Sequence, residues 1–281
     1  MEMQANVTSI KSNVSTINDN SFLDRAFLSL ASGLTKLPEL RRQVFVLSAL
    51  KKAGHLLVSR ELISKILSNQ KKDGGWSDIP ETVLAAYIIN DHLDHRSAYD
   101  KGIEWLIKSR IRNTAWGNSV RDVPRIPVTG LLFALLPILV DRASFLWLEN
   151  EWKKEMIGDT RLTYKGAFTL MAFAAASRSS VDPTLIIRTI EYLAAEQNKD
   201  GGFAPWRGHP IGSEPWSTGI VVIGLLSHPQ FIDTKVIERS LEWLLRNQLP
   251  NGLWPCHYID EGSAYCYWAA SQALRYLYKA G

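Results

Sequence analysis

The 281-residue sequence has few cysteines, no long apolar run and no block of charge of one sign. Its two cysteines, Cys256 and Cys266, argue against a disulfide framework and predict a reducing compartment. The first twenty residues lack a contiguous apolar core, so no signal peptide is predicted, and we expect residues 1–20 to form a flexible tail. The expected location is the cytoplasm, with a membrane-peripheral position as the alternative.

The formal net charge of +4 is spread along the chain, which argues against a nucleic-acid partner. It leaves anionic ligands and lipid surfaces open as partners. The most apolar stretch, residues 128–140, is too short to span a bilayer and contains Pro137. This stretch therefore predicts a helix that is buried on all sides within the protein.

One phrase recurs along the chain, as QKKDGGW at 70–76, QNKDGGF at 197–203 and QLPNGLW at 248–254. A degenerate copy at 110–116 has Arg in the Gln position and keeps the Trp. Apolar residues recur at helical spacing before each Gln, and Asp-Gly or Asn-Gly then favours the end of a helix. The aromatic follows just past the turn, where it can pack over a helical hairpin. We interpret this phrase as a structural fastener between helices.

Between the fasteners the pattern predicts twelve helices in six hairpins, near residues 22–33, 38–53, 58–69, 81–92, 97–109, 127–140, 144–156, 162–177, 182–197, 215–227, 233–247 and 263–279. The second member of each pair is richer in small and apolar residues, so we expect it in an inner ring. The predicted fold is all-α, an (α/α)6 barrel that forms one domain over residues 21–281, with the fasteners on its outside.

The Gln-x-x-Asp-Gly-Gly-Trp phrase resembles the repeat of squalene–hopene and oxidosqualene cyclases and of protein prenyltransferase β subunits. The resemblance covers about residues 58–279, including the last repeat at 260–271. It implies the barrel fold and an isoprenoid-derived substrate, while activity depends on the site rather than the scaffold.

Several motifs that the resemblance calls for are absent. The sequence has neither Asp-x-Asp-Asp, which supplies the acid of class II cyclases, nor the magnesium-binding Asp-Asp-x-x-Asp. Protein prenyltransferases bind zinc through Asp, Cys and His. Cys256, His257, Asp260 and Cys266 crowd the last repeat, but in a different order and spacing. We therefore expect no metal and no redox cofactor, with zinc or magnesium as an unsupported alternative.

Six parallel inner helices would gather six amino termini, each with a partial positive charge, at one end of the barrel. This arrangement predicts a site for an anionic group there. The carboxylates expected at this end are Glu81, Glu214, Asp260 and Glu261. Glu214 is the first candidate for the catalytic acid, with Asp260 and Glu81 behind it. Because Pro215 suits the first turn of a helix, Glu214 is also expected at the cap position, which would favour its ionised form.

The expected substrate-binding residues fall into two groups. Lys165, Arg207 and His209 would hold an anionic head group. The aromatic candidates that would line an apolar cavity and shield cationic intermediates are Tyr164, Trp216, Tyr265 and Tyr267.

These observations predict a terpene-cyclase-like enzyme, a cyclase, isomerase or lyase that protonates an apolar, isoprenoid-derived substrate. One alternative is a non-catalytic barrel that binds a hydrophobic ligand. Another is a prenyltransferase β-like subunit that needs a partner chain. The sequence assigns no oligomeric state.

Overall fold

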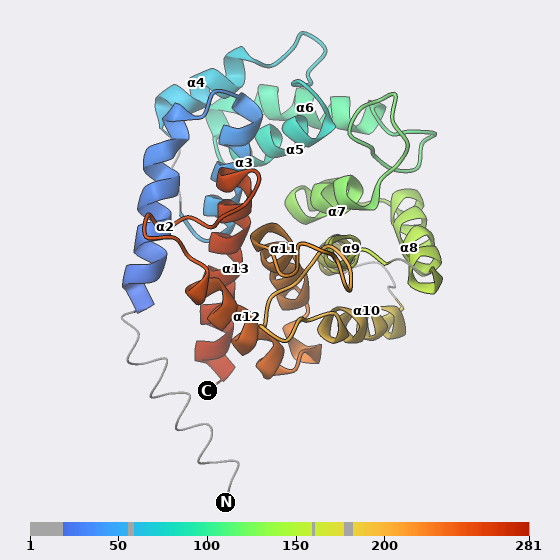
Figure 1. Cartoon of the computed structure of the whole chain (residues 1–281). Helices are drawn as coiled ribbons and strands as arrows, with labels where there is room; N and C mark the ends of the chain where they lie inside the picture. Colours follow the sequence, from blue (N-terminus) through green and yellow to red (C-terminus); the bar gives the residue numbers. More distant parts are fainter. Residues whose placement is uncertain (1–18, 56–58, 159–160, 177–181, 281) are drawn as a thin grey trace, which may run out of the picture.

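The computed structural model describes residues 19–55, 59–158, 161–176 and 182–280, so the predicted tail at 1–20 lies almost entirely outside the described residues. Within these ranges, twelve α-helices alternate between an outer and an inner ring (Figure 1). The outer helices are α2 (Asp19–Gly33), α4 (Arg60–Ser68), α6 (Arg96–Lys108), α8 (Arg142–Ile157), α10 (Pro183–Ala195) and α12 (Thr234–Arg246). The inner helices are α3 (Leu40–Lys52), α5 (Ile79–Ile89), α7 (Ile126–Leu135), α9 (Thr163–Ala175), α11 (Pro215–Leu226) and α13 (Ile259–Ala280).

The inner helices close a ring: each contacts the next, from α3 through α5, α7, α9 and α11 to α13, and α13 packs against α3. Small residues permit this close packing. A Cβ at Gly224 of α11 would lie 2.6 Å from the Cα of Ala167 in α9. A Cβ at Gly219 would lie 2.9 Å from the Cβ of Tyr265 in α13. The predicted all-α barrel, with the small-residue helices inside, is confirmed.

The fasteners tie the outer ring together. The Gln70 side-chain amide donates to the carbonyl oxygen of Gly74 in its own turn and to that of Ala98 in α6, both at 2.8 Å. Gln197 makes the same pair of bonds, to its own turn and to α12. Gln248 reaches the carbonyl oxygen of Phe22 in α2 at 3.1 Å. This last bond joins the final outer helix to the first, so the repeat also closes the barrel.

The degenerate copy acts through charge instead of an amide. Arg110 forms an ion pair with Asp141, whose carboxylate caps α8 by accepting a hydrogen bond of 2.9 Å from the Ser144 backbone N–H. Trp116 keeps its place and is fully buried. The fourth fastener therefore links α6 to α8 in the way that the others link their neighbours.

Two helix boundaries differ from the prediction in ways that matter for the site. The helix predicted at 127–140 ends at Leu135, and a 3-10 turn at Pro137–Leu139 follows, because a residue before proline disfavours the helical conformation. Helix α13 begins at Ile259 rather than near 263, which brings Asp260 and Glu261 into its first turn. Among the described helices, none has the length and apolarity needed to cross a bilayer.

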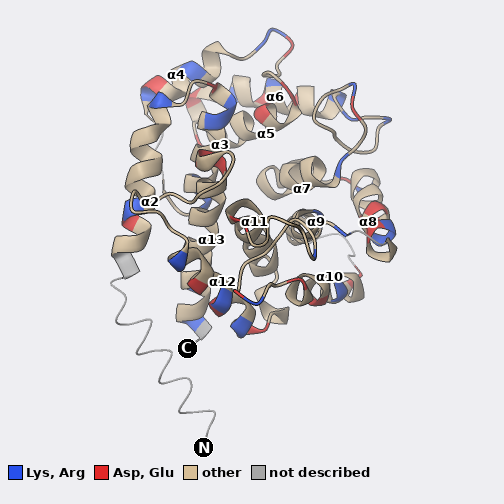
Figure 2. Ribbon diagram, viewed as in Figure 1, with Lys and Arg blue, Asp and Glu red and all other residues tan. Residues whose placement is uncertain are grey.

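Charged side chains lie mainly on the outer helices and on the connecting loops, while α7 and α11 are almost free of them (Figure 2). Because the inner helices are parallel, their amino termini meet at one end of the barrel and their carboxyl termini at the other. We call these the amino-terminal mouth and the carboxyl-terminal end.

Candidate functional site

The structure brings most of the predicted site residues to the amino-terminal mouth, where each belongs to the start of an inner helix. Glu81 lies in the first turn of α5, Tyr164 and Lys165 in that of α9, and Asp260 in that of α13. Glu214 immediately precedes α11. The helical partial charges and these side chains therefore converge on one region, as the parallel arrangement predicts.

The carboxylate of Asp260 forms an ion pair with a residue that is distant in the sequence. The Arg42 guanidinium, at the start of α3, donates two hydrogen bonds to its carboxylate, the one from Nε being 2.9 Å long. This bond is the main reason that the pKa of Arg42 is raised above its usual value. Asp260 is only 7% exposed, so the pair is the principal electrostatic link between α3 and α13.

Glu214 is the N-cap of α11, as the proline after it predicts. Its carboxylate accepts hydrogen bonds from the backbone N–H groups of Trp216 at 3.0 Å and Ser217 at 2.6 Å. These bonds satisfy two backbone N–H groups at the amino terminus of α11. Glu214 therefore has a structural role as the cap of α11.

Glu81 is not a cap, because Asp78 takes that role and accepts a bond of 2.8 Å from the Glu81 backbone N–H. The Glu81 side chain is 93% buried, and burial raises the pKa of its carboxyl above the usual range. The nearby Asp78 carboxylate raises this pKa further, while Arg41 and Lys71 lower it.

Glu261 shares this property, and the sequence did not rank it among the catalytic candidates. Burial raises the pKa of its carboxyl, while the Arg41 guanidinium and a polar contact with the Trp216 side chain oppose that effect. Its carboxylate in turn contributes to the raised pKa of Tyr265, whose main cause is burial. A predicted helix start at 259 would have placed Glu261 in the first turn of α13, beside the other candidates. The predicted start near 263 left it outside the helix.

Three of the four predicted aromatics form one cluster, which Glu261 contacts through Trp216. The ring of Trp216 stands edge-on to Tyr164 at 5.4 Å and to Tyr265 at 6.0 Å between centroids. Phe45 of α3 contacts Tyr265 edge-on at 4.8 Å. We call these four residues the mouth aromatic cluster.

Tyr267 faces a different neighbourhood. Its hydroxyl lies 2.6 Å from Nε2 of His55, and its ring is 6.4 Å from that of Phe27 in the outer helix α2. Helical geometry explains this: Tyr265 and Tyr267 are two residues apart, so they point to different sides of α13.

Two of the predicted anion-binding side chains pair with outer helices, and the third bonds within its own loop. Lys165 forms an ion pair with Glu155 of α8. Arg207 lies 2.9 Å from Glu196 and donates to the carbonyl oxygen of Ala195. The Nδ1 atom of His209 accepts a hydrogen bond of 3.1 Å from the Ile211 backbone N–H.

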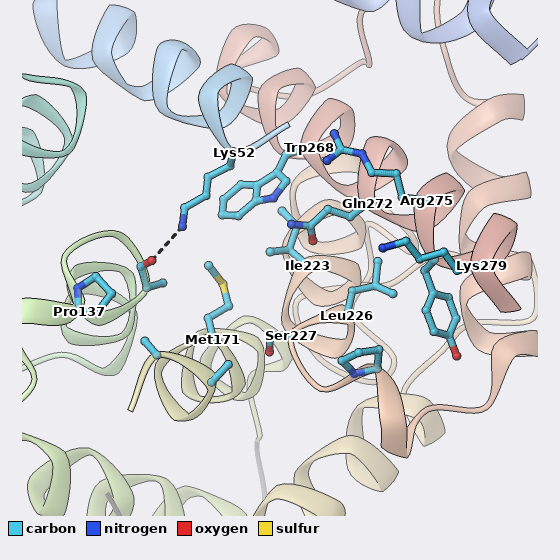
Figure 3. A pocket seen from close by; sticks show the side chains of 15 residues that line it. Lys52, Pro137, Met171, Ile223, Leu226, Ser227, Trp268, Gln272, Arg275 and Lys279 are labelled. Atoms are coloured by element: carbon cyan, nitrogen blue, oxygen red, sulfur yellow. Dashed lines mark hydrogen bonds between the residues drawn. The ribbon is translucent and has the colours of Figure 1, made fainter. Parts of the chain in front are cut away.

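A cavity of about 430 Å³ lies at the opposite end of the barrel. Its walls are largely apolar, and three cationic side chains reach it from α3 and α13 (Figure 3). None of the predicted site residues lines it. Those that do are Lys52, Ala134, Pro137, Met171, Ala174, Ala175, Ile223, Leu226, Ser227, Pro229, Trp268, Gln272, Arg275, Tyr276 and Lys279.

Two aromatic side chains lie between the mouth and this cavity. Tyr265 and Trp268 are stacked at an interplanar angle of 17°, with centroids 6.4 Å apart. Both line a small internal void of about 10 Å³, and Trp268 also lines the large cavity. The axis of the barrel thus passes from the mouth aromatic cluster through Tyr265 and Trp268 to the carboxyl-terminal end.

The two cysteines of the last repeat do not form a shared metal site among the described residues. The thiol of Cys266 is fully buried within α13 and donates to the carbonyl oxygen of Pro215 at 3.2 Å, while Cys256 is partly exposed. No group of three His, Cys, Asp or Glu side chains suited to a metal ion occurs within the described ranges.

Comparison with known proteins rests on structure alone. No family model matches the sequence, and neither does any curated protein. The type II terpene cyclase MstE from Scytonema superposes with a TM-score of 0.69 at 17% identity, over 91% of this chain and 96% of that one. An MstE variant in complex with geranylgeranyl dihydroxybenzoate, its substrate, gives 0.65 at 15% identity over 92% and 98%.

A protein from Actinoplanes is similar over 92% of this chain and 99% of its own, with a TM-score of 0.72 at 13% identity. Another MstE variant was solved with the product merosterolic acid A. The coverage of these chains is nearly complete in both directions. The chain therefore has the all-α toroidal fold of the type II terpene cyclases.

Proposed function

We propose that this protein is a terpene-cyclase-like enzyme that binds an apolar, isoprenoid-derived substrate and cyclises or isomerises it by protonation, without a redox cofactor. The observation that carries this proposal is Glu261, a half-buried carboxyl with a raised pKa that contacts Trp216 of the mouth aromatic cluster. The buried Glu81 is a second carboxyl with a raised pKa at the same end of the barrel. The shared fold supports it, because MstE acts on a geranylgeranyl compound.

In the proposed reaction, the protonated carboxyl of Glu261 gives its proton to a carbon of a substrate double bond. A raised pKa keeps a larger fraction of this carboxyl protonated near neutral pH. The resulting carbocation is attacked by the electrons of a second double bond, which forms a ring C–C bond. Loss of a proton from a carbon next to the final cation gives an isomer of the substrate and restores the proton balance.

The other residues of the mouth have supporting roles in this proposal. The faces of Trp216, Tyr164 and Tyr265 would stabilise the cationic intermediates. Glu81 is the second carboxyl that can exchange a proton with the substrate. Glu214 positions α11 as its cap, and Asp260 holds α13 in place through Arg42.

A sensitive test uses geranylgeranyl dihydroxybenzoate as the probe, with the reaction run in H₂O and in D₂O. In H₂O the product should have the mass of the substrate and a new retention time. In D₂O it should gain one deuterium, because a deuteron is added and a proton is lost. Glu261→Gln should lower turnover by about 10²–10⁴-fold, the usual contribution of general acid catalysis.

Glu61→Gln is the matched control, since Glu61 is an exposed carboxylate on the outer helix α4. It should leave turnover unchanged. The two carboxyls would be excluded as proton donors if the Glu261→Gln and Glu81→Gln proteins each converted the probe at a rate within about threefold of the unaltered protein.

A second candidate function is a non-catalytic barrel that binds a hydrophobic ligand. It is favoured by the absence of Asp-x-Asp-Asp from the sequence and by the pairing of Asp260 with Arg42. Saturable binding of the same probe without any isomer formed would support this candidate and contradict the proposed enzyme.

A further inference from the structure

The described residues that line the large cavity at the carboxyl-terminal end include three cations. Among the described residues that line it, Lys52, Arg275 and Lys279 are cationic and none is Asp or Glu. Figure 3 shows Lys52 on one side of the cavity and Arg275 and Lys279 on the other, with Trp268 between them. Like charges around a partly enclosed space repel one another, so an anion bound between them would be stabilised.

Two of the cations, Lys52 and Arg275, are held in place but keep hydrogen-bonding capacity. Lys52 Nζ donates to the carbonyl oxygen of Ala134 at 3.0 Å, and the Arg275 guanidinium donates to that of Ala53. A lysine has three donors and an arginine five, so both retain donors for a ligand. Burial lowers the pKa of Lys52, and the charge of Lys51 lowers it further, as expected for a half-buried cation that has no carboxylate partner among the described residues.

A buried hydrogen-bond donor, the indole N–H of Trp268, also lies at the inner end of the cavity. Trp268 is 95% buried and lines the cavity, yet its indole N–H finds no hydrogen-bond partner among the described residues. An unpaired buried donor costs free energy, which a ligand acceptor would recover.

We propose that this cavity is a binding site for a single-chain amphipathic anion, with its hydrocarbon chain against Met171, Ile223 and Leu226 and its phosphate or carboxylate group between the three cations. The volume of about 430 Å³ lies within the range of roughly 300–1,000 Å³ that small-molecule sites occupy. The site is at the far end of the barrel from Glu81 and Glu261, so it does not depend on the chemistry proposed at the mouth.

Isothermal titration calorimetry on the full chain tests this site with four probes: dodecyl phosphate, dodecanoate, dodecanol and inorganic phosphate, all kept below micelle formation. Both amphipathic anions should bind with one site per chain. Dodecanol, which keeps the chain and lacks the charge, should bind at least about tenfold more weakly, because hydrogen bonds to charged groups are lost. Inorganic phosphate should not compete at equal concentration, because it has no apolar part.

Lys279→Gln and Lys52→Gln should each weaken dodecyl phosphate binding by about tenfold and leave dodecanol binding unchanged. Lys72→Gln is the matched control, because it removes an exposed charge from the loop before α5, at the other end of the barrel. It should change the affinity for neither dodecyl phosphate nor dodecanol. Trp268→Phe keeps an aromatic ring, removes the unpaired donor and should also weaken the anions selectively. Lys279 is exposed, so its variant reports on the site even where Lys52→Gln fails to fold.

Equal affinity for dodecanol and dodecyl phosphate, or an unchanged affinity in both lysine variants, would overturn the proposal. Binding of inorganic phosphate as tight as that of dodecyl phosphate would identify a simple anion site and would also contradict it. Glu261→Gln separates the two ends of the barrel: it should abolish turnover of the prenylated probe and leave dodecyl phosphate binding intact.

Discussion

The indole nitrogen of Trp76 donates a hydrogen bond of 2.8 Å to the carbonyl oxygen of Ile66, ten residues earlier in the outer helix α4. Trp116 makes the same bond to Leu106 at 2.7 Å, and Trp254 makes it to Leu244 at 2.8 Å. Each ring is fully buried and satisfies a carbonyl group near the end of the helix before it. In these three copies the tryptophan is thus both a packing residue and a helix-end cap, whereas Phe203 in the remaining copy has only the packing role.

We therefore expect Trp254→Ala to lower the free energy of unfolding by about 3–5 kcal/mol, the usual effect of removing a large buried aromatic. Trp254→Phe, which keeps most of the ring and loses the hydrogen bond, should have a clearly smaller effect. Urea denaturation measures both. A Trp254→Ala protein as stable as the unaltered one, with its activity lost, would instead assign this residue to the site.

Gly224→Ala should destabilise the barrel by about 1–3 kcal/mol, because the added methyl group would overlap Ala167 across the contact of α11 with α9. Gly33→Ala is the matched control, since a Cβ there would meet no atom within 4 Å. Thermal unfolding of both variants measures the difference. Equal midpoints for the two would show that the inner ring can expand at no cost.

The pH dependence of stability tests the environment of Glu261. Burial raises the pKa of its carboxyl above the ordinary 4.5. Between 4.5 and the raised pKa, the folded protein keeps a proton that the unfolded chain has lost, so this group makes stability fall as the pH rises. Glu261→Gln should remove that part of the decline. Urea unfolding from pH 4 upward, with Glu61→Gln as the control, should show the two curves diverging; parallel curves would contradict the raised pKa.

Glu214 should behave as a cap. Glu214→Ala removes both bonds to the amino terminus of α11 and should lower stability by about 0.5–2 kcal/mol. Glu214→Gln keeps an acceptor oxygen, so its stability should fall less and its turnover should stay within about threefold of the unaltered protein. A loss of turnover by 10² or more in Glu214→Gln, with the fold intact, would return Glu214 to the role of proton-transfer group.

The sequence determined the architecture because its signals are local and repeated. Helical spacing before each Gln, a turn of Asp-Gly or Asn-Gly, and a following aromatic predict the hairpins. Small residues in every second helix predict which ring each helix joins. The local rule that residues before proline avoid the helical conformation would also have predicted the end of α7 before Pro137.

Only the tertiary structure decided which mouth residues are available. Asp260 and Glu261 are adjacent, and nothing local separates their roles. Arg42, 218 residues away, pairs with Asp260 and leaves Glu261 beside Trp216. The cavity depends even more on long-range packing: Lys52, Met171 and Trp268 come from three helices that meet only when the ring closes. Burial and pairing decide the chemistry of a carboxyl or a lysine, and both are set by residues distant in the sequence.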